Sequence, residues 1–142
     1  MKRYTAREIE VRREYDRALP PLTIYGSELN QVWTNLLDNA IDAVGESGTI
    51  TLRTTRDGDC ILVDIADSGP GIPPDVRSHV FEPFFTTKDV GSGTGLGLDT
   101  ARRIVVERHG GSMTFDTSER GTTFHVWLRL HPSSPVRMEN RP

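Results

Sequence analysis

The sequence has a single cysteine and lacks any apolar run long enough to span a bilayer, and these shortages exclude several classes of protein. Cys60 alone can form neither an internal disulfide nor a multi-cysteine zinc site, and its apolar, strand-like surroundings predict a buried thiol. Residues 1–17 carry charges throughout and lack the apolar centre of a signal peptide. We therefore expect a cytoplasmic domain that makes no membrane contact.

A strong excess of charge is also lacking. The net charge is −3 over 142 residues, so bulk electrostatics give no reason to expect a nucleic-acid partner. This length suits one domain with a real core better than two domains. We assign residues 1–130 to that domain and predict that the tail at 131–142, rich in proline, serine and charge, is disordered.

What the sequence does contain is a strongly patterned stretch at 27–44, SELNQVWTNLLDNAIDAV. Its apolar residues recur at three- and four-residue spacing, which predicts a helix with one buried face. A polar stripe of Gln31, Asn35, Asn39 and Asp42 runs beside that face. Asparagine is a mediocre helix former, and its neutral amide oxygen suits Mg²⁺, so the two asparagines are candidate metal ligands. A solvated helix face is the competing interpretation.

The remaining patterns predict short elements on both sides of a glycine- and proline-rich middle. A second helix is expected to end at His109, before Gly110 and Gly111. Strands are expected at 7–16, 49–55, 60–66, 112–117 and 122–130, with a short helical turn at 75–80. Strands clustered in this way favour a mainly antiparallel sheet with helices on one face. The predicted fold class is therefore α+β, a two-layer α/β sandwich.

Two glycine-rich stretches could approach a phosphate group or a flat ring. In GSGTGLGL at 91–98, bare backbone amides precede a helix and could bind an anion, although the run matches neither a Walker A loop nor GxGxxG. In DSGPGI at 67–72, Asp67 keeps the strand parity of the core residues before it, so its carboxylate could accept a hydrogen bond from an exocyclic amine such as that of adenine. A flexible loop and a plain turn are the competing interpretations.

Five stretches taken in order resemble the N, G1, F, G2 and G3 boxes of the ATP-binding catalytic domain of sensor histidine kinases. They are NLLDNA at 35–40, DSGPGI at 67–72, FEPFFTTK at 81–88, GSGTGLGL at 91–98 and GTTF at 121–124. This domain belongs to a wider group that includes gyrase B subunits, large heat-shock chaperones and mismatch-repair ATPases. The resemblance covers residues 7–130. It implies a Bergerat-type fold with ATP and Mg²⁺ bound between the helices under a lid at 73–94.

The resemblance also implies a role for each matching residue. Asn39, assisted by Asn35, would hold Mg²⁺ against the phosphates, and Asp67 would bind the adenine amino group. Lys88 would reach the phosphates from the lid, so Asn35, Asn39 and Lys88 form the implied catalytic set. The other implied nucleotide contacts are Gly69, Gly71, Ile72 and Thr123 around the ring, and Gly93, Thr94, Gly95, Leu96, Gly97 and Leu98 in the backbone cradle. Phe81, Phe84 and Phe85 would anchor the lid, with core packing as the competing interpretation.

Position 35 distinguishes between chemistries within this wider group. The gyrase-like and chaperone-like relatives carry a water-activating glutamate four residues before the metal-binding asparagine, whereas this chain carries Asn35, whose amide cannot take a proton at neutral pH. Glu28 lies about 10 Å away along the helix axis. The site therefore lacks an evident base for rapid hydrolysis. That suits transfer of the γ-phosphoryl group to a histidine on a separate helical dimerisation and phosphoacceptor domain, with a response regulator downstream.

No histidine of the chain lies in the context of a phosphoacceptor. The four are His79, His109, His125 and His131. We therefore expect the ATP-binding half of a kinase, monomeric in isolation and unable to phosphorylate itself. Two alternatives remain: a stand-alone protein-serine kinase of the anti-sigma-factor type, against which Asn35 and FEPFFTTK argue, and a non-enzymatic nucleotide-responsive binding module.

Overall fold

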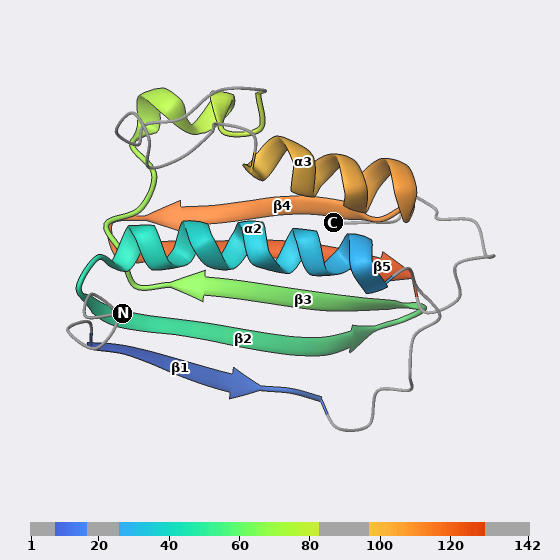
Figure 1. Ribbon diagram of the computed structural model, residues 1–142, viewed down its shortest axis with the longest axis horizontal. Helices are drawn as coiled ribbons and strands as arrows, with labels where there is room; N and C mark the ends of the chain where they lie inside the picture. Colours follow the sequence, from blue (N-terminus) through green and yellow to red (C-terminus); the bar gives the residue numbers. More distant parts are fainter. Residues whose placement is uncertain (1–7, 17–25, 83–96, 130–142) are drawn as a thin grey trace.

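The computed structural model describes residues 8–16, 26–82 and 97–129 (Figure 1). Its elements in chain order are β1 (Glu8–Glu14), α2 (Gly26–Val44), β2 (Ser47–Asp57), β3 (Cys60–Asp67), the 3₁₀ helix η1 (Pro74–His79), α3 (Gly97–Arg103), the π-helical turn η2 (Ile104–Arg108), β4 (Ser112–Ser118) and β5 (Gly121–Arg129). Within these ranges, no helix combines the length and the apolar character needed to cross a membrane.

The strands form one sheet in the order β1-β2-β3-β5-β4. β1 runs parallel to β2, and the other neighbouring pairs are antiparallel. Both α2 and α3 lie over the same face of this sheet (Figure 1). The predicted two-layer α/β sandwich is therefore confirmed, with β1 as the parallel edge strand and β5 inserted between β3 and β4.

The core lies between the helices and the sheet. The apolar stripe predicted for the central helix is buried there, with Leu29, Val32 and Leu36 each no more than 1% exposed. Ala101 and Val105 extend this layer from α3 and η2, and the sheet contributes Ile50, Ile65, Met113, Phe124, Val126 and Leu128. Each large apolar side chain buried in this way contributes roughly 1.5–3 kcal/mol. The lone thiol of Cys60 is buried, as the sequence predicts.

The second helix differs from the prediction in its last turn. It is α-helical only to Arg103 and continues as the π-helical turn η2. Gly110 then takes a φ of 65°, and the Gly111 N–H donates to Val105 O at 2.9 Å. A Cβ on Gly111 would lie 2.0 Å from Trp127 O. The close approach of this turn to β5 explains why two glycines end the helix.

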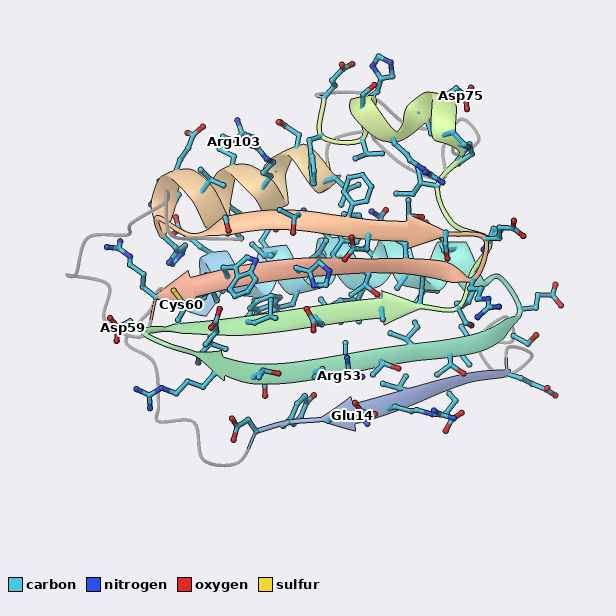
Figure 2. All side chains as sticks on the ribbon, turned by 180° about the vertical axis from the view of Figure 1, so that it is seen from behind. Glu14, Arg53, Asp59, Cys60, Asp75 and Arg103 are labelled. Carbon is cyan, nitrogen blue, oxygen red and sulfur yellow. The ribbon has the colours of Figure 1, made fainter. Side chains whose placement is uncertain are left out.

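The opposite face of the sheet, which we call the outer face, carries a row of charged side chains. Glu14, Arg53, Asp64 and His125 occupy neighbouring positions on β1, β2, β3 and β5. Arg53 pairs with Glu14 at 2.8 Å, and Figure 2 shows these two side chains beside each other. His125 bridges two carboxylates, with Nδ1 2.7 Å from Asp64 and Nε2 2.7 Å from Asp116. This row is polar, as is usual for the solvated side of an antiparallel sheet, while Leu62 and Trp127 stand opposite each other on the same face.

The two carboxylates make the stability of the outer face dependent on pH. Burial lowers the pKa of His125, but the hydrogen bonds and charges of Asp64 and Asp116 outweigh it and raise the pKa above the ordinary 6.5. A raised folded-state pKa adds stability that is fully present below the unfolded pKa and is lost as pH rises through the folded pKa.

We expect the variant His125→Gln to be less stable than wild type below about pH 6, and this difference to shrink as pH rises toward about 9, because wild type then loses its imidazolium. Urea unfolding at both pH values measures the difference. His79→Gln is the control, since His79 also pairs with a carboxylate, that of Glu82, at 2.9 Å, but its side chain is exposed. A stability gap for His125→Gln that stays constant across this range would contradict the prediction.

Candidate functional site

The polar stripe of α2 connects the two helices. Gln31 Nε2 donates to Asn35 Oδ1 at 2.8 Å, and Asn35 Nδ2 donates to Gly97 O at 2.9 Å. Asn35 therefore holds the first residue of α3 against the flank of α2. Asn39 lies one turn further along, half-buried, and its amide makes no hydrogen bond to another residue in the described part of the chain. Of the two asparagines, Asn39 has the oxygen that is open to a ligand.

Asp67 is the last residue of β3 and points to the helix side of the sheet. Its Oδ1 accepts the Gly69 N–H at 2.9 Å. Burial raises the pKa of Asp67, while hydrogen bonds from the backbone N–H groups of Gly69 and Thr122 oppose that rise. The carboxylate is therefore short of water and is held in place by backbone donors, so it is suited to accept a further hydrogen bond from a ligand.

The glycines after Asp67 let the loop fit between a helix and a turn. A Cβ on Gly69 would lie 2.6 Å from Ala43 O in α2, and a Cβ on Gly71 would lie 1.9 Å from Ser118 O. Gly71 also has a φ of 87°, which favours glycine. Because Ser118 is the last residue of β4, this contact holds the loop after β3 against the end of β4.

Two threonine hydroxyls complete this end of the site. Thr117 Oγ1 accepts the Ile72 N–H at 2.8 Å and lies 2.8 Å from Thr122 Oγ1. Thr122 is 5% exposed and stands opposite Asp67 in the β3–β5 register. Cross-strand partners share a face, so Thr122 and Asp67 both point toward the helices.

The structure does not bring Thr123 together with Asp67, although the resemblance places Thr123 at the ring. Thr123 stands opposite Ala66 and Asp116, so its side chain points to the outer face. Thr122 occupies the position on the helix side instead. The sequence contains a signal for this, because Thr122 shares the alternation of the apolar residues Phe124, Val126 and Leu128.

Phe81 packs in the core beside the site. Its ring centroid lies 5.9 Å from that of Phe115 and 6.4 Å from that of Phe124, both in edge-to-face contact. The guanidinium of Arg102 lies 5.5 Å from the Phe81 ring centroid. The structure shows the core packing of Phe81, and its implied role in anchoring the lid stays a prediction. Leu98 and Ile72 are also partly buried against the core.

Several residues implied by the resemblance lie outside the described ranges. They are Phe84, Phe85, Lys88, Gly93, Thr94, Gly95 and Leu96. Their implied roles stay predictions.

The described site residues extend along one flank of α2. Asp67 and Gly69 lie near Ala43 at one end, Asn35 contacts Gly97 at the other, and Asn39 lies between them. Ala43 and Asn35 are about 12 Å apart along the helix axis. One end thus offers a carboxylate and hydroxyl groups to a polar ring, and the other offers amide groups, an arrangement that suits an elongated ligand with chemically different ends.

Comparison with known sequences gives consistent matches. A family model described as histidine kinase-, DNA gyrase B- and HSP90-like ATPase matches residues 25–132. The sensor kinase CckA of Brucella abortus is 38% identical over 144 residues, which cover 90% of this chain and 15% of the relative. The sensor histidine kinase ZraS of Escherichia coli K12 is 40% identical over 127 residues, covering 89% and 27%. The chain thus spans well under a third of the length of these relatives.

Solved structures give the same result. The catalytic domain of the histidine kinase ThkA matches with a TM-score of 0.79 and 35% identity, covering 87% of this chain and 80% of that chain. ThkA is also matched in its complex with the response regulator protein TrrA, with a TM-score of 0.74, 31% identity, and coverage of 94% and 36%. The match to the catalytic domain spans most of both chains, so the likeness extends to the whole unit.

Proposed function

The chain belongs to the family of histidine kinase-, DNA gyrase B- and HSP90-like ATPases, as the ATP-binding catalytic domain of a sensor histidine kinase, and from this premise we propose that it transfers the γ-phosphoryl group of ATP to a histidine on a separate helical phosphoacceptor domain. The observation that carries the proposal is the state of Asn35. Its amide is bonded at both ends, to Gln31 and to Gly97, and supplies no group that could activate water.

Glu28 supports the same conclusion, because it is occupied elsewhere. It forms an ion pair with Arg108, and its Oε1 lies 3.5 Å from His109 Nε2. This contact joins the beginning of α2 to the end of η2, far from Asp67. With neither Asn35 nor Glu28 in place as a base, slow hydrolysis preserves the γ-phosphoryl group for a nucleophile from another domain, such as a neutral imidazole.

The described residues fit the adenosine part of ATP. Asp67 is a fixed, half-buried acceptor for an amino group. Gly69 and Gly71 let the loop beside it pack closely against α2 and the end of β4, and Thr122 adds a hydroxyl on the same face as Asp67. Together Asp67 and Thr122 supply a polar edge for a small aromatic base. This fit supports the placement of the adenine next to the β3–β5 pair.

Asn39 is the residue we assign to Mg²⁺, with Asn35 assisting. The Asn39 amide oxygen is a hard neutral ligand with no competing hydrogen bond from the described residues, whereas Asn35 Oδ1 already accepts from Gln31. When bound, the ion would supply positive charge to the phosphate oxygens. Lys88, outside the described ranges, is proposed to add a second positive charge.

The variant Asn39→Ala is expected to bind a non-hydrolysable ATP analogue about tenfold more weakly in Mg²⁺, because one oxygen ligand is lost, and to differ little from wild type in EDTA. Calorimetric titration in both conditions measures this. Asn30→Ala is the matched control, since Asn30 is exposed on the same helix. If Asn39→Ala lost the same affinity for the ATP analogue with and without Mg²⁺, Asn39 would not be a ligand of the metal ion.

Two adjacent threonines test the placement of the base. We expect Thr122→Val to weaken binding of the ATP analogue by about tenfold through loss of one hydroxyl, and Thr123→Val to leave it within about twofold. The reason is that only Thr122 shares a face with Asp67. Titration of both variants under identical conditions gives the comparison. A larger loss of affinity in Thr123→Val than in Thr122→Val would assign the contact with the base to Thr123 and overturn the proposed position of the base.

The histidines in the described ranges are all engaged in structural contacts. His79 pairs with Glu82, His109 is 8% exposed near Glu28, and His125 lies between two aspartates. These contacts support an acceptor histidine on another domain. We propose that this acceptor domain dimerises and that the chain alone is monomeric. A response regulator would receive the phosphoryl group next, and the reaction would take place in the cytoplasm, where ATP is available.

Incubation with γ-labelled ATP and Mg²⁺ tests the function directly. We expect no acid-labile label on the chain alone, and label on a histidine when a helical phosphoacceptor domain is added. Label on serine of an added protein would instead support the anti-sigma-factor type of kinase. Nucleotide binding without transfer to any acceptor would support the non-enzymatic module.

A further inference from the structure

The side-chain amide of Asn35 has a hydrogen bond on each side, and the bond to α3 fixes which way round the amide lies. Asn35 Nδ2 donates to Gly97 O at 2.9 Å, and a carbonyl oxygen can only accept. The amide nitrogen therefore faces Gly97, and the amide oxygen faces away from α3. A reversed amide would place two acceptors, Asn35 Oδ1 and Gly97 O, against each other.

Gln31 supplies the donor that the other side of this amide needs. Its Nε2 lies 2.8 Å from Asn35 Oδ1, one helical turn earlier on the same flank of α2. Because the Asn35 oxygen can only accept, the Gln31 amide presents its nitrogen there. Neither bond involves a hydroxyl, so the direction of both bonds follows from the Gly97 carbonyl.

The two bonds have different surroundings. Gln31 is exposed, whereas Asn35 and Gly97 are half-buried against each other, and a Cβ on Gly97 would lie 3.9 Å from Asn35 Cβ and Cγ. A side-chain pair one turn apart on an exposed helix face adds little stability. The contact with Gln31 therefore matters for direction, because it favours the orientation in which the Asn35 nitrogen meets α3. Asn39 lies one turn beyond Asn35 on this flank.

We propose that Gln31 is a positioning residue for phosphoryl transfer. It orients the Asn35 amide so that the nitrogen holds the Gly97 carbonyl, and it thereby fixes the start of α3 against the flank of α2 that carries Asn39. Gln31 acts through Asn35 and does not contact the nucleotide. This inference rests on the proposed function, since it concerns the end of the site where the phosphates of ATP would lie.

Two substitutions of Gln31 separate the direction of the hydrogen bond from the rest of the side chain. Methionine and glutamate are close to glutamine in length and in helix propensity. Gln31→Met removes the donor, whereas Gln31→Glu places an acceptor beside Asn35 Oδ1, so that the carboxylate draws the Asn35 nitrogen away from Gly97. In calorimetric titration with a non-hydrolysable ATP analogue and Mg²⁺, we expect Gln31→Met to bind about threefold and Gln31→Glu about tenfold more weakly than wild type.

Thr34→Glu is the matched control, because it adds the same negative charge at an exposed position of the same helix. It is expected to bind the ATP analogue within about twofold of wild type, since salt screens exposed charges. Adenosine, which lacks phosphates, is expected to bind equally to wild type and to all three variants in an NMR titration, because it reaches only the Asp67 end. A loss in Thr34→Glu as large as that in Gln31→Glu, or an equal loss for adenosine, would overturn the proposal.

A double substitution shows whether Gln31 acts through Asn35. In an Asn35→Ala background, Gln31→Glu is expected to weaken binding of the ATP analogue by no more than about a further twofold, because the amide that Gln31 orients is absent. A further loss of about tenfold in that background would mean that Gln31 acts by another route, and the proposal would be wrong.

A measurement on the free chain completes the test. The ¹³C resonance of the Gly97 carbonyl reports the hydrogen bond that this oxygen accepts. We expect it to move to the same position in Gln31→Glu and Asn35→Ala, and to keep its wild-type position in Thr34→Glu. An unchanged resonance in Gln31→Glu would contradict the inference.

Failure of the two proposals is distinguishable. If wild type binds the ATP analogue and Gln31→Glu binds it equally well, this inference fails alone. If wild type does not bind the analogue, the proposed function fails, and the Gly97 resonance still shows whether Gln31 sets the direction of the Asn35 amide.

Discussion

The variant Asp67→Asn is expected to bind a non-hydrolysable ATP analogue at least about 30-fold more weakly than wild type, because a hydrogen bond to a charged acceptor is worth about 2 kcal/mol. The substitution keeps the size of the side chain and one oxygen for the Gly69 N–H, but it removes the charge and puts a donor where the base needs an acceptor. Calorimetric titration with and without Mg²⁺ measures the loss, which we expect in both conditions.

The folded state provides an internal check on this result. Burial raises the pKa of Asp67 in the folded state above its value in the unfolded chain. The ionised carboxylate therefore lowers the free energy of unfolding, and this contribution disappears as pH falls and Asp67 takes up a proton. Removing the charge should therefore leave the melting temperature at or above that of wild type. Asp38→Asn, on the exposed side of α2, is the matched control for loss of a carboxylate. If Asp67→Asn bound the ATP analogue as tightly as wild type, the nucleotide would not contact this carboxylate.

The variant Gly71→Ala is expected to lose roughly 3 kcal/mol or more of unfolding free energy through a steric clash and backbone strain acting together. The new Cβ would lie 1.9 Å from the Ser118 carbonyl oxygen, which cannot move without shifting the β4–β5 turn, and the φ of 87° disfavours any side chain. Urea unfolding gives the free energy. Binding of the ATP analogue should fall as well, because the displaced loop carries Gly69 and Ile72.

Gly58→Ala separates the two causes. Gly58 has a similar φ of 62° in the hairpin turn between β2 and β3, but nothing lies within 4 Å of an added Cβ. That variant is expected to lose only about 1 kcal/mol, the cost of a left-handed backbone. Equal losses in both variants would mean that the contact between Gly71 and Ser118 adds nothing.

The elements that could be predicted from the sequence are those defined by local patterns. The apolar spacing at 27–44 predicts both α2 and its buried face. Gly45 and Gly58, which take positive φ values after α2 and between β2 and β3, are glycines at positions where a helix end and a hairpin turn favour them. Strand parity correctly placed Asp67 on the core side. In each case the determining information lies within a few residues.

Features that depend on distant partners could not be predicted in this way. The contact between Thr117 and Ile72 joins residues 45 positions apart, and no local pattern indicates it. The π-helical turn at the end of the second helix accompanies the close packing of Gly111 against β5, which only the tertiary structure shows. The motif indicates Thr123, whereas the apolar alternation that begins at Phe124 indicates Thr122, and the β3–β5 register agrees with the alternation.

The place of β5 in the sheet has a consequence for the order in which the domain can become active. β5 is the last described strand in the chain, yet it lies between β3 and β4 and supplies Thr122 opposite Asp67. On the ribosome, where the chain emerges from its N-terminus, Asp67 is synthesised long before the strand that completes its surroundings. Non-local pairing of this kind is slow to form. A nascent domain of this architecture therefore completes the surroundings of Asp67 late, and until β5 pairs with it the central strand β3 is an open edge.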